Sequence, residues 1–254
     1  MKSPNVSIIT PTKNQGNYLE KCILSVLSQD SNIIEYIIID GSSTDTTIEI
    51  LKKYEHEISY WISEPDKGQS DALNKGLKKC TGDIIGWINS DDYYEPNALS
   101  HVAQIFNENQ NINVVYGNCR MIYPNSTCVV KPLKVNYLSL LQYWRPYFLP
   151  PQPSIFFRRI ALGDFWFNEN LHYGMDLQLW LHLAKENKFH YVDRILSNYL
   201  VHEESKTGGI GNWNKFYAEW KVLCEDEIRA LSGVDRLNLK FRKYMYLLKR
   251  KIKK

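Results

Sequence analysis

Two adjacent acidic residues, Asp91 and Asp92, have the type and spacing that metal chemistry requires. They follow the apolar run Ile84–Ile88, which predicts a strand, so both carboxylates would stand at its carboxyl end. Adjacent carboxylates repel each other, and a divalent cation such as Mg²⁺ or Mn²⁺, which prefers oxygen ligands, removes that repulsion. The same cation would neutralise a diphosphate leaving group. The alternative is that the pair caps a helix or lies in a solvated turn.

Three further polar residues are candidates for chemistry, and each has a structural alternative. Asp40 could accept a hydrogen bond from a nucleobase N–H or a ribose hydroxyl, or it forms an Asx turn with Gly41. Asp176 opens a predicted helix, as a general base or as a helix cap. His202 is either a metal ligand or a hydrogen-bonded structural histidine.

The elements that must position these residues alternate along the first half of the chain. This alternation predicts a Rossmann-like α/β fold, with a mostly parallel sheet flanked by helices. Ligands of such sheets bind at the carboxyl ends of the strands, where Pro11, Asp40 and the acid pair would lie along one edge. The predicted strands are Val6–Thr10, Tyr36–Ile39, Ile58–Ile62, Ile84–Ile88, Val114–Tyr116, Ser154–Phe157 and His190–Val192. The predicted helices are Tyr18–Leu27, one that starts at a Thr46–Glu49 capping box, Ser70–Lys79, Ala98–Asn107 and Asp176–Lys185.

Two common nucleotide-binding signatures are absent from the sequence. No GxGxxG follows the first predicted strand, and no GxxxxGK[ST] occurs anywhere. A nucleotide would therefore be held by carboxylates and a metal. A nucleotidyltransferase would need a basic, glycine-rich early loop, which residues 11–16 do not provide.

Composition sets the outer limits of the interpretation. A chain of 254 residues suits one large α/β domain, or one domain with a small appendage. The five cysteines are scattered without a CxxC pair, so neither a zinc site nor a disulfide framework is indicated. No run approaches the roughly 20 apolar residues of a membrane helix, and the N-terminal apolar stretch is too short for a signal peptide. We expect a protein that is neither secreted nor integral to the membrane.

The C-terminal segment carries most of the positive charge. Nine of the 31 basic residues lie in residues 236–254, which contain no acid, so the rest of the chain has 22 basic and 28 acidic residues. Apolar residues of this segment share one helical face, namely Leu237, Phe241, Tyr244, Leu248 and Ile252. A basic amphipathic helix favours an anionic membrane surface. The alternatives are a solvated terminal helix and nucleic-acid binding, and the acidic body argues against nucleic acid.

Taken together, these residues resemble glycosyltransferase family 2, whose members have the GT-A fold, over about residues 5–206. Residues 66–76 (DKGQSDALNKG) are the most specific stretch, followed by Thr81–Asp83 and Asn89–Asp92. Other stretches typical of the family are Val6–Asn14, Asp40–Asp45, Gln152–Arg158, Phe167–Leu171, Met175-Asp176 and His202–Lys206.

The resemblance implies roles for individual residues and an inverting transfer from a nucleotide sugar. Asp176 matches the position of the catalytic base, and Asp92 that of the metal ligand for Mn²⁺ or Mg²⁺, with His202 as a second candidate ligand. Asp91 matches a ribose or phosphate contact. The residues expected around the nucleotide are Pro11, Thr12, Asn14, Asp40, Lys67 and Asp71. A UDP-sugar is the favoured donor, and the acceptor is a saccharide, with Trp144, Tyr147 and Trp180 as candidates for stacking on sugars.

Two departures from the family pattern leave a rival function open. Asn89 stands where the metal motif usually begins with Asp, and Met175 where Glu often precedes the base. They allow a degenerate subunit that binds sugar nucleotides without turnover. Against this rival stand the retained acids Asp91, Asp92 and Asp176.

The organisation of the chain follows from the same resemblance. Residues 1–206 form the expected GT-A domain, with a nucleotide-binding part over about 1–118 and an acceptor-binding part over about 119–206. Residues 207–254 form a helical extension with a basic tail. The expected setting is cytoplasmic, peripheral to the inner face of the cell membrane, with a lipid-linked acceptor. A homodimer through the helices after Trp213 is a further possibility.

Overall fold

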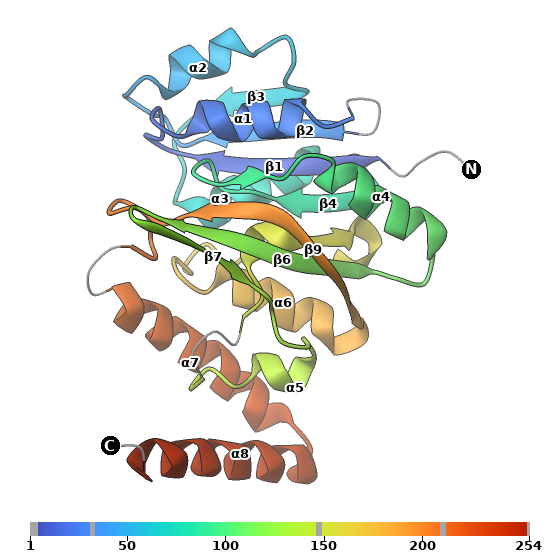
Figure 1. Ribbon diagram of the computed structural model, residues 1–254, viewed down its shortest axis with the longest axis vertical. Helices are drawn as coiled ribbons and strands as arrows, with labels where there is room; N and C mark the ends of the chain where they lie inside the picture. Colours follow the sequence, from blue (N-terminus) through green and yellow to red (C-terminus); the bar gives the residue numbers. More distant parts are fainter. Residues whose placement is uncertain (1–4, 31–33, 146–148, 209–211, 253–254) are drawn as a thin grey trace.

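The computed structural model describes residues 5–30, 34–145, 149–208 and 212–252. Within them one nine-stranded sheet has the order β3-β2-β1-β4-β8-β6-β9-β5, with β7 paired to β6, and helices cover both faces (Figure 1). The strands are β1 (Val6–Thr12), β2 (Ile34–Asp40), β3 (Tyr60–Ser63), β4 (Ile84–Trp87), β5 (Tyr93–Tyr94), β6 (Val114–Tyr123), β7 (Ser126–Val130), β8 (Ile155–Arg158) and β9 (Phe189–Leu200). The helices are α1 (Leu19–Leu27), α2 (Thr47–Lys53), α3 (Gln69–Lys79), α4 (Ala98–Glu108), α5 (Tyr137–Leu140), α6 (Met175–Glu186), α7 (Asn212–Ala230) and α8 (Gly233–Ile252).

The strands β3, β2, β1 and β4 are parallel, as the sequence predicts. Successive residues of a strand point to opposite faces, and the apolar residues of β1, β2 and β4 are mostly buried on both faces, whereas β3 is only partly buried. Ile8 and Ile38 pack with α1, α2 and α4 on one face, whereas Ile9 and Ile37 pack with α3 and α6 on the other. The predicted α/β class with flanking helices is confirmed.

Beyond β4 the sheet is mixed, which the predicted mostly parallel arrangement did not anticipate. The strand β8 runs antiparallel to both β4 and β6, and β9 runs parallel to β6. Both β6 and β9 extend well past the predicted Val114–Tyr116 and His190–Val192. Polar residues such as Asn118 and Asp193 interrupt their apolar pattern, but the side chains of these two residues bond to each other across the pair, at 2.9 Å.

One predicted local motif is wrong. Thr46 is the N-cap residue of α2, but its side chain makes no capping bond, so the expected Thr46–Glu49 box does not form. Asp45 takes that place, since its Oδ1 accepts from the Thr47 N–H at 3.0 Å and its Oδ2 from the Gly16 N–H at 2.9 Å. The acid therefore holds the start of α2 to the loop after β1.

The helices α7 and α8 lie at the end of the molecule away from β3 (Figure 1). Glu227 of α7 bonds to the Tyr137 hydroxyl and to Lys185 of α6, at 2.6 Å each. Leu239 of α8 is buried, and Lys243 donates to the Tyr143 hydroxyl at 2.7 Å. None of the helices in the described ranges is long and apolar enough to span a membrane.

The contact of α3 with β1 gives a stability prediction, because a Cβ at Gly76 would lie 2.5 Å from Cγ2 of the buried Ile9. We expect Gly76→Val to lower the free energy of unfolding by about 2–3 kcal/mol through overpacking. Urea denaturation measures the change. Gly233→Ala is the control, since nothing in the described chain lies within 4 Å of a Cβ there. Equal stability of the two variants would contradict the packing argument.

Candidate active site

The carboxyl ends of the parallel strands share one edge, as predicted. Thr12 and Asp40 are register partners at the ends of β1 and β2, and Asp40 pairs in turn with Ser63 of β3. The Thr12 Oγ1 atom is buried without a hydrogen-bond partner in the described part of the chain. An unpaired buried hydroxyl is unfavourable, so this edge offers a polar atom to a ligand.

Asp40 is fully buried and organises the turn after β2. Its Oδ2 accepts from the Ser43 N–H at 2.9 Å and from the Ser63 hydroxyl at 2.6 Å, while its Oδ1 accepts from the Ser43 hydroxyl. This is the turn-forming alternative for Asp40, and its nucleobase contact stays a prediction. Gly41 next to it admits Asp66, whose Oδ2 would lie 2.4 Å from a Cβ at position 41.

Asn14 joins the loops that follow β1 and β2. Its Oδ1 accepts from the Thr44 N–H at 2.8 Å, and its own N–H donates to the Ser43 hydroxyl at 2.7 Å. Its φ of 52° lies in the left-handed region, which Asn tolerates better than most residues. Asn14 therefore shapes this edge, and its contact with a nucleotide, like that of Pro11 within β1, stays a prediction.

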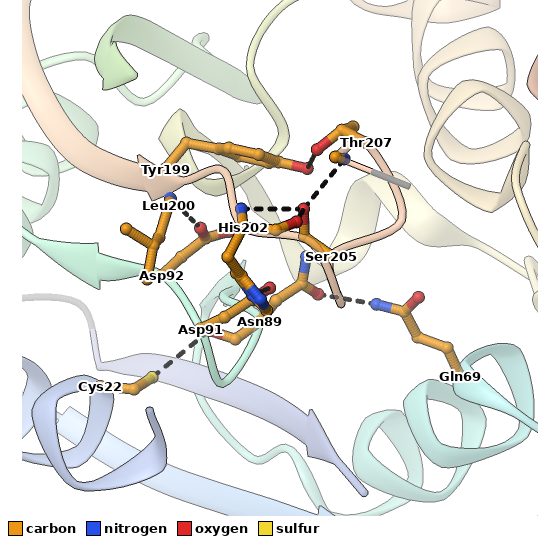
Figure 2. Close-up of polar contacts among 11 residues, drawn as sticks. Cys22, Gln69, Asn89, Asp91, Asp92, Tyr199, Leu200, His202, Ser205 and Thr207 are labelled. Carbon is orange, nitrogen blue, oxygen red and sulfur yellow. Dashed lines mark hydrogen bonds and ion pairs between the residues drawn. The ribbon is translucent and has the colours of Figure 1, made fainter. Parts of the chain in front are cut away.

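The acid pair meets the loop after β9 (Figure 2). His202 Nε2 lies 3.1 Å from Asp91 Oδ2, and the His202 ring stacks on Tyr18 with centroids 4.2 Å apart. The sequence grouped His202 with Asp92 as metal ligands, whereas the bond that forms is to Asp91. The side chains of His202 and Asp91 are only 12% and 19% exposed, so their interaction is largely shielded from water.

Asp92 is buried more deeply, at 1% exposure. Its Oδ1 accepts from the Leu200 N–H at 3.0 Å (Figure 2), and its Oδ2 has no partner in the described structure. Burial, together with the charge of Asp91, raises the pKa of Asp92 well above its usual value. A cation would relieve this cost, because it compensates both carboxylates.

These residues fit a divalent metal that is shared with a ligand. No group of three or more His, Cys, Asp or Glu in the described ranges is arranged to hold a metal by itself. Asp91 and His202 still supply an oxygen and a nitrogen in contact with each other, and the neighbouring Asp92 has a buried oxygen without a partner in the described structure. Mg²⁺ and related ions typically combine one or two carboxylates with substrate phosphates and water.

Asn89, the departure from the family metal motif, has a structural role. Its Oδ1 accepts from Gln69 Nε2 at 2.7 Å and from the Trp87 indole N–H at 2.9 Å. Both acceptor positions of this oxygen are thereby used. Asn89 therefore ties the start of α3 to the end of β4.

Asp176 is the second residue of α6 and is partly buried. Its Oδ1 accepts from the Leu177 N–H at 2.7 Å. Burial raises the pKa of Asp176 to about 6, although that bond and the positive charge of Lys206 oppose the rise. A carboxylate with a pKa near neutrality suits a general base, so a place at the helix start and a basic role are compatible.

Lys206 connects the parts of the site; from the sequence it is a candidate, together with His202, for contact with a metal and a phosphate, and that role stays a prediction. Its ammonium donates to Gln69 Oε1 and to the His172 carbonyl, at 2.7 Å each. Desolvation lowers the pKa of Lys206, while the charges of Asp176, Glu219 and Asp91 oppose that shift. The His202–Lys206 motif contained this residue, but only the fold brings it among these three acids.

Lys67 lies in the loop that leads into α3, and Asp71 lies in the first turn of this helix. Lys67 Nζ is ion-paired to Glu169 at 2.8 Å, and the Lys67 N–H donates to Asp71 Oδ2 at 3.1 Å. Asp71 lines a hollow of about 460 Å³ together with Trp166. Their role at a nucleotide stays a prediction.

The predicted stacking aromatics are mostly core residues. Trp180 is 1% exposed and Trp144 is 8% exposed, so neither offers a free face to a sugar. Tyr147 lies outside the described residues.

The chain matches the family model "Glycosyl transferase family 2" over residues 7–159. An uncharacterized glycosyltransferase of Rickettsia typhi is 31% identical over 247 residues, which cover 91% of this chain and 76% of the relative. One from Rickettsia conorii is 28% identical over 255 residues, covering 95% of this chain but 41% of the relative. Pasteurella multocida hyaluronan synthase is 28% identical over 222 residues, 84% of this chain and 22% of the synthase. The chain thus spans less than half of the last two relatives.

Two solved structures have a similar fold. S. aureus TarS 1-349 in complex with UDP-GlcNAc superposes with a TM-score of 0.74 at 20% identity, covering 92% of this chain and 70% of TarS 1-349. The mannosyltransferase PcManGT from Pyrobaculum calidifontis, in complex with GDP-Man and Mn²⁺, superposes with a TM-score of 0.62 at 15% identity. The match covers 97% of this chain and 81% of PcManGT. The helical arrangement around the sheet is therefore that of GT-A glycosyltransferases.

The buried Asp92 gives a prediction for stability against pH in metal-free protein. Because its folded pKa lies above the unfolded value of about 3.9, the native state binds more protons, and stability falls as pH rises from about 4. Asp92→Asn removes this loss. Relative to wild type, the free energy of unfolding of this variant should rise as the pH increases from about 4.5 to 7, in urea denaturation with EDTA. Parallel pH curves for the two proteins would refute the expectation.

Proposed function

The chain belongs to glycosyl transferase family 2, and we propose that it transfers a sugar from a nucleotide-diphosphate sugar to a saccharide acceptor, with inversion at the anomeric carbon. The observation that carries the proposal is the basic carboxylate of Asp176, which shares the ammonium of Lys206 with Asp91 at the end of β4. The proposed base, the Lys206 ammonium and the acid pair proposed to bind a cation thus interact electrostatically near the edge of the sheet where ligands of such folds bind.

In the proposed reaction an acceptor hydroxyl attacks the anomeric carbon as the bond to the diphosphate oxygen breaks on the opposite side. The hydroxyl proton moves to Asp176. Since the Leu177 N–H holds Oδ1, we assign the proton to Oδ2. The products are an inverted glycoside and a nucleoside diphosphate, whose growing negative charge lies toward Lys206.

Donor binding is proposed at the edge formed by Thr12, Asp40 and Asp91. Asp91 and Asp92, with His202, would hold Mn²⁺ or Mg²⁺, and the ion would offset the charge of the departing diphosphate. The Mn²⁺ and GDP-Man of the mannosyltransferase with a similar fold support a metal, and the UDP-GlcNAc bound to TarS supports a UDP-sugar. The similarity to hyaluronan synthase supports a saccharide acceptor.

A lipid-linked acceptor at an anionic membrane is proposed from α8. Leu237, Phe241 and Tyr244 are 68%, 63% and 62% exposed, whereas Leu239 on the opposite side is 2% exposed. The apolar stripe predicted for this helix is therefore free at these positions, and the Ile252 side chain lies outside the described residues. The nine basic residues within 236–254 complement anionic headgroups. We propose that the helix rests on the inner face of the cell membrane.

The first prediction here concerns turnover. Purified protein is incubated with a panel of nucleotide sugars, with and without Mn²⁺, and release of nucleoside diphosphate is followed. We expect metal-dependent release from one donor, rising with pH through about 6 as Asp176 deprotonates. Asp176→Asn should lower kcat roughly 10²- to 10⁴-fold without weakening donor binding, because it removes the proton acceptor. Asp193→Asn, an exposed acid paired with Lys131, is the matched control and should retain activity.

The outcomes separate the two classes of function. Metal-dependent binding of a nucleoside diphosphate by calorimetry, without turnover across donors and saccharide acceptors, would indicate the non-catalytic subunit that Asn89 and Met175 leave open. If none of the donors binds to the protein, the proposed nucleotide site is refuted. Wild-type turnover by Asp176→Asn would refute the assigned base.

The second prediction concerns the membrane. Wild-type protein should co-sediment with vesicles that contain phosphatidylglycerol and much less with pure phosphatidylcholine. Changing Leu237, Phe241 and Tyr244 together to Ser should weaken binding at least about tenfold, since each buried side chain contributes about 1.5–3 kcal/mol. Val222→Ser changes an exposed apolar residue on α7 and should bind as wild type does. Unaltered binding of the triple variant would remove this proposal. A dimer lost only in that variant would assign the face to a second copy.

A further inference from the structure

The helix α7 contacts the loop that leads into Asp176. The Glu219 carboxylate accepts from three successive backbone N–H groups, those of His172, Tyr173 and Gly174. The bonds to Glu219 Oε2 are 3.1, 2.8 and 2.7 Å long, and His172 also lies 3.1 Å from Oε1. Successive N–H groups that converge in this way form an anion-binding concavity.

This concavity lies at the start of α6, whose N-cap residue is Gly174. The first N–H groups of a helix lack partners within it, and negative charge near them is favourable. Gly174 has no side chain to supply that charge. The carboxylate comes instead from 45 residues later in the chain.

The loop of residues 172–174 is held by packing against α7 and by a hydrogen bond from Lys206. The Tyr173 ring lies against Phe216 of α7, with centroids 4.9 Å apart. A Cβ at Gly174 would lie 3.1 Å from Leu223 Cδ1 and 3.3 Å from Glu219 Cβ, so the helix approaches the backbone closely. On the other side, the His172 carbonyl accepts from Lys206 at 2.7 Å.

Asp176 follows this loop by two residues, and several charged or titratable groups act on it. Lys206 comes from the segment after β9, Glu219 from α7, and Tyr199 from β9. Desolvation is the main cause of the raised pKa of Asp176, and the negative charge of Glu219 adds to it. Loss of that charge would lower the pKa of Asp176.

We infer that Glu219 is a positioning residue, which fixes the backbone of residues 172–174 and thereby the orientation of Asp176 toward the acceptor. The inference rests on the proposed role of Asp176 as the base. It makes α7 a part of the catalytic apparatus, although the sequence places this helix in an extension outside the transferase domain. The connection depends on charge and on hydrogen bonds to three backbone N–H groups, so a neutral isostere at position 219 removes the charge and weakens these bonds.

The test compares Glu219→Gln with Glu227→Gln in the full chain. Glu227 is a matched control, since it joins the same helix to Tyr137 and Lys185 and has no bond to residues 172–174 in the described structure. Amide hydrogen exchange over residues 170–176 should become at least about tenfold faster in Glu219→Gln only. Its kcat should fall roughly 10- to 100-fold, with donor KM unchanged, because a small misplacement of the base is costly. The acidic limb of its pH profile should move to lower pH.

Each outcome decides one question. If amide hydrogen exchange over residues 170–176 in Glu219→Gln is as slow as in the wild type, Glu219 does not fix the backbone of residues 172–174, and the inference is overturned. Faster exchange with a wild-type kcat and pH profile would reduce Glu219 to a structural residue and overturn the positioning role, while the proposed function stands. A wild-type protein without turnover on any donor and acceptor would instead refute the proposed function, and the inference with it.

Discussion

Asp91 and Asp92 carry adjacent carboxylates into a region with little water, and much of the surrounding structure compensates for that arrangement. Desolvation and the charge of Asp91 both oppose ionisation of Asp92, and the Leu200 N–H satisfies only one oxygen of Asp92. His202 faces Asp91, and the charge of Lys206 acts on it from the same segment. The segment after β9 therefore brings to the end of β4 the positive and hydrogen-bonding groups that the acids need.

The same compensation couples distant parts of the chain. Lys206 bonds to Gln69 at the start of α3, and Gln69 bonds to Asn89 beside the acids. Lys206 also bonds to the loop before α6, which Glu219 holds from the far side. The amide of Asn89 can donate and accept at once, but only its oxygen is needed here, as acceptor from Gln69 and Trp87. A neutral residue at this position satisfies both donors without adding a third negative charge beside Asp91 and Asp92.

Sequence patterns predicted those features that depend on neighbours along the chain. The buried runs of β1, β2 and β4 and the edge where Thr12 and Asp40 meet follow from periodicity and from the geometry of parallel strands. The lengths of β6 and β9 could not be predicted, because polar residues in them are satisfied only by the partner strand. The bond from His202 to Asp91 was also beyond the sequence, since it joins the turn after β4 to the segment after β9, 111 residues along the chain.

Glu219 had no local signal at all, and this bears on how the chain divides. An acid in an amphipathic helix looks like any solvated side chain until the fold brings a loop against it. Sequence reasoning placed a boundary at residue 206 because the family resemblance ends there. Glu219 and Phe216 instead join α7 to the loop of residues 172–174, and Glu227 joins α7 to α6. In the described residues of α8, Leu237, Phe241 and Tyr244 are exposed, so the proposed roles in catalysis and in membrane attachment would divide near Gly233 and not at residue 206.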